Sequence, residues 1–156
     1  MAPRVLILAC GNPLRSDDGV GWHAAQLLRE GLRAAETEIV SVHQLTPELA
    51  EAAASACGII FLDAAQNGTP GDIACLPVHR DAEPERFSHA LTPGQVMALC
   101  EQLYGVRPQA YMVSIAGECF DHGEGLSATV ASALPQLIDT VEALIARLAT
   151  ASARSR

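Results

Sequence analysis

The chain has 156 residues, of which 49% are hydrophobic and only 4% aromatic, and its formal net charge at pH 7 is −8. We expect a single domain with one aliphatic core over residues 1–150 and a disordered tail over residues 151–156. The acidic charge argues against nucleic-acid or membrane binding, and the apolar run 5–10 is too short for a membrane span or secretory signal, so the sequence predicts a cytoplasmic protein.

The first part of the chain alternates two kinds of pattern. Residues 4–9 form a continuous apolar run, which is typical of a strand buried on both faces of a sheet. Apolar side chains then recur at helical spacing over residues 18–34. β-Branched residues indicate a second strand over 37–43, and a Thr-Pro start predicts a short alanine-rich helix over 46–56.

The middle of the chain holds two further strands and an irregular segment. Residues 58–62 predict a fully apolar strand, and the turn residues that follow it predict a return strand over 72–78 beside this predecessor. Residues 79–91 are charged and lack any period. We interpret this segment as a candidate functional loop.

The last third of the chain begins with a helix start. Thr92 and Gln95 have the spacing of a capping box, which predicts a helix to about Tyr104. A strand over 109–116 follows, then a glycine-rich loop, and apolar positions from Val130 to Leu148 indicate a long terminal helix. Pro135 either kinks this helix or marks its true start.

This order of elements predicts an α/β fold, a three-layer α/β/α sandwich around a twisted, mostly parallel sheet of about five strands. In such sheets ligands bind beyond the carboxyl ends of the strands. Asp17 and Asp18 follow the first predicted strand, and Asp63 follows the third. We therefore expect these acidic residues to lie at one edge of the sheet.

The loop over residues 11–21 is neither a dinucleotide fingerprint nor a phosphate-binding loop. A carboxylate at a helix N-terminus can simply cap the helix, and this reading remains open for either aspartate. We interpret Asp17 as the helix-capping neighbour and Asp18 as the carboxylate that is free to bind a ligand. Asp63 can equally bond to neighbouring backbone or reach into the cleft at the sheet edge.

A histidine is needed to complete a metal site with these acids. His89 lies in the irregular segment, and His79, His23 and His122 are further candidates, although a lone histidine is usually incidental. Two carboxylates and one imidazole form an incomplete site for Ni²⁺ or Zn²⁺. Such a site suits docking onto an ion that another protein already holds through thiolates.

Several segments resemble the nickel–iron hydrogenase maturation protease family. The first loop reads Gly-Asn, four residues, then Asp-Asp-Gly-x-Gly, and Asp-Ala ends a hydrophobic strand. The likeness extends from Val5 to about Leu148 and includes segments 43–49, 88–93 and 117–127. The resemblance implies the α/β/α fold and an aspartate-dependent endopeptidase that removes the C-terminal extension of the large-subunit precursor of a nickel–iron hydrogenase after nickel insertion.

The resemblance also implies a site and a cofactor source. The family's nickel-contacting residues fall on Asp18, Asp63 and His89, with nickel supplied by the substrate and no tightly bound organic cofactor. Some relatives place the histidine just after the proline, where this chain has Gly94, and His79 is the reserve for the third ligand.

The sequence contains no familiar catalytic motif with a nucleophile. Our hypothesis is that Asp18 or Asp63 activates a water for amide hydrolysis. Two other functions compete: a non-catalytic nickel-sensing maturation chaperone that uses the same three residues, and a small-molecule hydrolase that holds its own metal.

Overall fold

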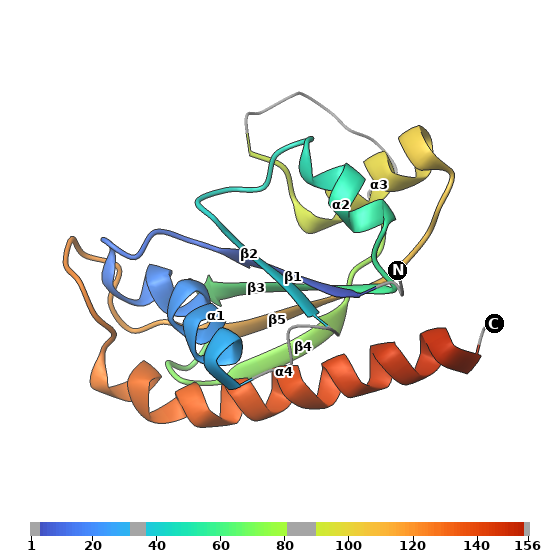
Figure 1. The fold of residues 1–156 in the computed structure, drawn as a ribbon. Coiled ribbons are helices and arrows are strands. Elements are labelled where there is room, and N and C mark those ends of the chain that lie inside the picture. The colour runs from blue at the N-terminus through green and yellow to red at the C-terminus, as the bar shows by residue number, and fades with distance from the viewer. Residues whose placement is uncertain (1–3, 32–36, 81–89, 155–156) are drawn as a thin grey trace.

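The computed structural model describes residues 4–31, 37–80 and 90–154, and its centre is a single twisted sheet (Figure 1). The strand order is β2-β1-β3-β5-β4. β1, β2, β3 and β5 run parallel, and β4 is antiparallel to β5. The bounds of the five strands are β1 Val5–Cys10, β2 Thr37–Val42, β3 Gly58–Ala65, β4 Ile73–Pro77 and β5 Gln109–Ala116.

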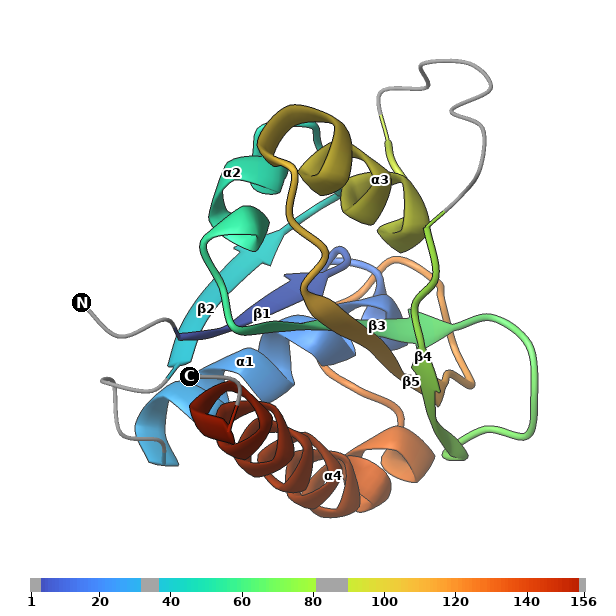
Figure 2. The same ribbon diagram turned by 90° about the vertical axis from the view of Figure 1, so that its right-hand side faces the viewer.

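Helices cover both faces of the sheet and complete the predicted three layers. One face carries α1 and α4, and the other carries α2 and α3, as Figures 1 and 2 show. A short 3-10 helix, η1, leads directly into α1. The bounds are η1 Ser16–Gly19, α1 Val20–Gly31, α2 Leu49–Ala54, α3 Pro93–Tyr104 and α4 Ala128–Arg154. The α/β/α fold predicted from the sequence is confirmed.

The core is divided in two by the sheet, because successive side chains of a strand point to opposite faces. Val5 and Ile7 of β1 pack with the buried residues of α1 and α4. Leu6 and Leu8 of the same strand pack with those of α2 and α3. β1 is buried at every position, which explains why its sequence is apolar without alternation.

The predicted pairing of β4 with β3 is wrong. The sequence suggested that residues 72–78 return beside residues 58–62, but β5 lies between β3 and β4 in the sheet. Turn residues after β3 show only that the chain reverses, and they do not specify which strand it pairs with. β4 is largely exposed and ends at Pro77, which cannot donate a backbone hydrogen bond, so it suits the sheet edge better than the apolar β5 does.

The helix boundaries also differ in part from the expected ones. The capping box is confirmed, because Gln95 N donates to Thr92 Oγ1 at 3.1 Å and Thr92 N donates to Gln95 Oε1 at 2.9 Å. α2 begins at Leu49, whose N–H donates to the Thr46 carbonyl, so Thr46 starts a turn and does not cap the helix. Pro135 lies inside α4 and does not mark its start.

α4 is the longest helix of the described chain and extends to Arg154, into the segment expected to be a tail. By length and composition alone it could cross a membrane. Its buried side chains, however, belong to the core cluster beneath the sheet, and they include Leu137, Val141 and Leu148. Within this fold α4 is therefore an amphipathic core helix.

Candidate functional site

Gly11 marks the point at which the two predicted acids meet. It follows β1 directly and has φ +135°, a conformation that favours glycine. A Cβ placed on Gly11 would lie 2.0 Å from the Asp18 carbonyl oxygen and 3.7 Å from Asp63 Oδ1. The backbone of Asp18 and the carboxylate of Asp63 thus approach the same glycine at the carboxyl edge of β1 and β3, where a side chain would not fit. The Asp18 carboxylate is also close enough for its charge to raise the pKa of Asp63.

The carboxylate of Asp18 turns back over the end of β1. Its Oδ2 accepts a hydrogen bond of 2.9 Å from the backbone N–H of Asn12, and its own N–H donates to the Arg15 carbonyl. The Asn12 side chain in turn accepts from Leu14 N at 2.9 Å. Asp18 is half-buried, so its remaining oxygen positions can reach a ligand at the sheet edge.

Asp63 lies inside β3, opposite Ser114 of β5, and does not follow the strand as the sequence suggested. Its Oδ1 accepts from Ala64 N at 2.8 Å. The pKa of Asp63 is raised to about 7. Burial is the largest cause, the Ala64 N–H acts in the opposite direction, and the nearby negative charge of Asp18 adds to the rise. A carboxyl group with this pKa can both take up and release a proton near neutral pH.

Cys10 is the last residue of β1 and adjoins this acid pair. Its pKa is raised to about 12 by burial and by the charge of Asp63. Because the thiolate is the nucleophilic form, the raised pKa disfavours Cys10 as a nucleophile at neutral pH. The thiol is part of the buried core that packs against α2 and α3.

Asp17 has a different role from the one inferred from the sequence. It is completely buried and accepts four hydrogen bonds, none from the helix that follows it: Glu118 N at 2.8 Å, Cys119 N at 3.0 Å, Ser127 N at 2.8 Å and Ser127 Oγ at 2.8 Å. Burial raises its pKa, but these bonds outweigh burial and hold the pKa below its usual value. Asp17 thus fastens the β1–α1 loop to the β5–α4 loop, about a hundred residues away.

Ser16 makes a second link between these loops. Its N–H donates to the Gly123 carbonyl at 2.9 Å and its Oγ donates to the Asp121 carbonyl at 2.8 Å. Ser16 has φ +52°, which is uncommon outside glycine and requires support from surrounding contacts. Together with Asp17, these bonds fix the turn that carries Asp18.

The histidine expected to complete the metal site is not placed by the described residues. His89 lies outside the described residues. Within the described ranges, no group of three or more His, Cys, Asp or Glu residues is arranged to hold a metal. His122 is exposed in the β5–α4 loop. The next described residues after His89 do reach the sheet edge, because Leu91 N donates to the carbonyl of Leu45, three residues past β2.

The strand register rules out His79 as the reserve ligand. Pro77 pairs with Tyr111, and Tyr111 is level with Ile60 of β3. Asp63 lies three residues farther along β3, about 10 Å in the direction of the carboxyl edge. His79 follows Pro77 in the opposite direction, so it stands at the other end of the sheet.

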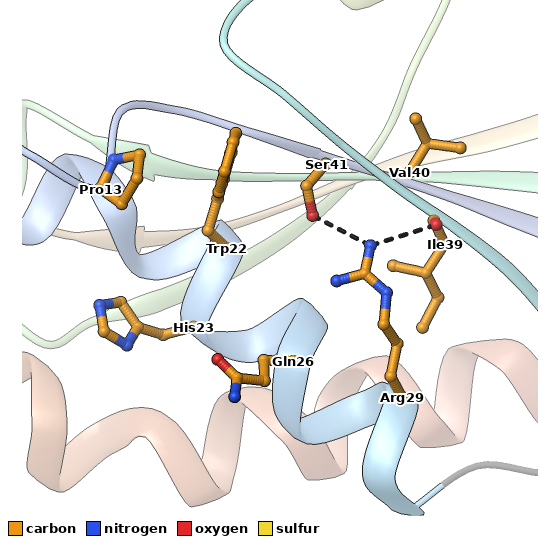
Figure 3. A pocket seen from close by; sticks show the side chains of 8 residues that line it. All are labelled: Pro13, Trp22, His23, Gln26, Arg29, Ile39, Val40 and Ser41. Carbon is orange, nitrogen blue, oxygen red and sulfur yellow. Dashed lines mark hydrogen bonds between the residues drawn. The ribbon is translucent and has the colours of Figure 1, made fainter.

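The sequence did not predict a groove that runs between α1 and β2 (Figure 3). Its volume is about 550 Å³, and Pro13 stands at one end of it. Trp22, His23 and Arg29 of α1 line one side, and Ile39 of β2 lines the other. Trp22 also packs against His43 with the two rings steeply inclined and 5.1 Å between their centroids, and its Nε1–H donates to the Val42 carbonyl. The one sequence signal for this groove is that its lining residues in α1 lie on the same face of that helix.

Comparison with solved structures finds proteins that share this fold. The chain resembles the hydrogenase maturating endopeptidase HybD from E. coli, with 22% identity, a TM-score of 0.77 and coverage of 92% of this chain and 93% of that one. It also resembles the hydrogenase maturation protease HybD from Thermococcus kodakarensis, with 25% identity, a TM-score of 0.70 and coverage of 91% and 99%. The protease HycI from the same organism gives 19% identity, a TM-score of 0.72 and coverage of 94% and 92%.

No protein-family model and no curated protein matches the chain. The chain nevertheless has the fold of the hydrogenase maturation endopeptidases over nearly its whole length. The resemblance inferred from the sequence motifs is confirmed at the level of the fold, and the neighbours that carry it are named as peptidases.

Proposed function

We propose that the chain is an endopeptidase that removes the C-terminal extension of the large-subunit precursor of a nickel–iron hydrogenase. The observation that carries this proposal is that Asp18 and Asp63 lie beside Gly11, close enough for the charge of Asp18 to act on Asp63, in a fold shared with hydrogenase maturation endopeptidases. The proposed reaction takes place in the cytoplasm on a precursor that already contains nickel.

The nickel of the precursor is the feature that the site recognises in this proposal. Asp18, Asp63 and His89 contact the ion, which the substrate holds through its own thiolates. Two carboxylates and one imidazole offer only three oxygen or nitrogen ligands, which are too few to remove nickel from thiolates. They can, however, fill open positions around the ion. The position of Leu91 at the carboxyl side of the sheet supports the choice of His89 over His79.

Asp63 is the better of the two acids for the proton transfers. As the base, its carboxylate takes a proton from water while the water oxygen bonds to the scissile carbonyl carbon. As the acid, it returns this proton to the peptide nitrogen while the carbon–nitrogen bond breaks. Before the precursor brings its nickel, the pKa of Asp63 is about 7, so neither of its protonation states is rare at neutral pH. Asp18 then serves as the ligand whose charge helps to set the pKa of Asp63.

The test is the intact mass of the precursor after incubation with the chain. Nickel-loaded precursor should lose one C-terminal segment, and nickel-free precursor should keep its full mass. Cleavage of both forms would contradict nickel recognition but leave the endopeptidase standing. An unchanged nickel-loaded precursor that stays bound to the chain would support the nickel-sensing chaperone and end the proteolytic proposal.

A further inference from the structure

β2 is an edge strand whose outer side faces the groove. Among the strands of residues 4–31, 37–80 and 90–154, it pairs with β1 alone. The Val42 carbonyl accepts from Gly11 N and so points towards β1, whereas the Ile39 carbonyl accepts from Arg29 Nη2 at 3.2 Å and so points away from it. Because backbone groups of a strand alternate in direction, the N–H and C=O of Ser41 also point outwards. These groups can pair with an added strand.

The groove starts beside the acid pair and ends at a cation. Pro13 stands at its start and packs on the loop of Asp18, since a Cβ on Gly19 would lie 2.6 Å from Pro13 Cα. At the far end Arg29 bonds to the Ile39 carbonyl and, at 3.1 Å, to Ser41 Oγ (Figure 3). From Trp22 to Arg29 the groove follows α1 for roughly 10 Å, which is the length of about three extended residues.

The chemistry of the lining favours a peptide that carries a negative charge. Among the described residues, His23 and Arg29 line the groove and no acidic residue does, although the whole chain has a net charge of −8. In the described part of the chain, the recorded ion pairs join Arg80 and Arg107 to Glu101, and none involves Arg29. The guanidinium is thus held in place by two neutral acceptors, and its other N–H groups can bind a carboxylate.

We propose that this groove binds the C-terminal extension of the precursor as an extended strand added to β2, with its terminal carboxylate at Arg29. The proposal rests on the proposed function, because that function supplies the extension as occupant. Strand addition at Ser41 holds the peptide backbone, and the apolar faces of Trp22 and Ile39 contact its side chains. The scissile bond then lies upstream, towards Pro13 and the acid pair.

Binding can be measured apart from cleavage. Trp22 is the only tryptophan of the chain, so its fluorescence reports occupancy of the groove. The probe is a synthetic peptide with the sequence of the extension alone, taken from the large subunit encoded in the same genome. It contains no scissile bond and no nickel, and it is titrated into the full wild-type chain. We expect a saturable change in emission.

Two changes test the assigned contacts. Arg29→Glu on the chain, or amidation of the peptide C-terminus, should weaken binding about ten-fold or more. Arg107→Glu makes the same charge change at a distant surface site and should alter Kd by less than about two-fold. N-Methylation of successive peptide amides should weaken binding only at alternate positions, which is the signature of an added strand.

The outcomes separate this inference from the proposed function. If the precursor is cleaved but the peptide leaves Trp22 emission unchanged, or binds Arg29→Glu as tightly as wild type, the groove assignment is overturned and the peptidase stands. If the peptide binds as expected but no precursor is cut, the proposed function fails and the groove stands. Equal weakening at all methylated positions would exclude strand addition.

Discussion

The protonation of Asp63 links the site to stability. The usual pKa of an aspartate is 3.8, and the folded chain raises it to about 7, chiefly by burial. Between these two pH values the unfolded chain has lost the proton that the folded chain keeps. This contribution to stability is therefore complete below about pH 4 and is lost as the pH rises through about 7.

Asp63→Asn should remove this pH dependence, because an amide does not ionise. We expect the variant to gain stability relative to wild type as the pH rises from about 4 to about 8, by an amount on the order of a few kcal/mol. Urea unfolding at several pH values measures the difference. Asp139→Asn, at an exposed position of α4, is the matched control and should track wild type. A constant difference between Asp63→Asn and wild type at all pH values would contradict the assigned pKa.

Asp17 and its neighbour Asp18 should lose different amounts of stability when each is replaced by asparagine. Asp17→Asn places an amide group against three backbone N–H donors and a hydroxyl, and we expect it to cost on the order of 3 kcal/mol or more in unfolding free energy. Asp18→Asn loses part of one backbone bond and should cost about 1 kcal/mol or less. Chemical denaturation at neutral pH compares them, and equal losses would reject the structural role of Asp17.

The interpretation of Asp17 as a helix cap was wrong, because the local sequence of these two adjacent aspartates does not show their partners. Both stand at the start of a predicted helix, and either one could cap it. The partners of Asp17 lie at residues 118, 119 and 127, so only the folded chain brings them into contact with it. Asp18 and Asp63 were more accessible to prediction, because both follow apolar strand sequence and parallel strands end at one edge of a sheet.

At the scale of elements, α1 approaches the sheet closely because Gly21 has no side chain. A Cβ there would lie 2.9 Å from both the Cys10 and the Leu62 carbonyl oxygens. Gly21→Ala should push α1 away from β1 and β3 and cost about 2 kcal/mol in stability. Gly31→Ala on the same helix meets nothing within 4 Å and should be neutral or stabilise by up to about 1 kcal/mol. Thermal unfolding of both variants measures this, and a neutral Gly21→Ala would contradict the packing.

Most elements could be predicted because their signals are local. Capping residues define α3, and apolar runs define β1 and β3. The pairing of β4 could not be predicted, because β5, which separates it from β3, is about forty residues later in the chain. The groove between α1 and β2 could not be predicted either, because no local sequence pattern shows how far apart these two elements lie in the folded chain.

At the scale of the whole molecule, the fold gathers the proposed functional features on one side. The carboxyl edge of the parallel strands carries the acid pair, the two loops joined by Asp17 support it, and the groove leads away from it along β2. This arrangement would let a precursor present its nickel at the acids and its extension along the groove. The two docking features can be altered separately, since Arg29 and Asp63 belong to different elements.

The proposed function requires that the acid pair beside Gly11 carries out the hydrolysis. It is tested by the intact mass of nickel-loaded precursor after incubation with wild type, Asp63→Asn and Asp139→Asn in parallel. We expect wild type and Asp139→Asn to shorten the precursor by the same segment, and Asp63→Asn to leave it at full length while remaining folded. Cleavage by Asp63→Asn at the wild-type rate would show that Asp63 does not carry out the hydrolysis.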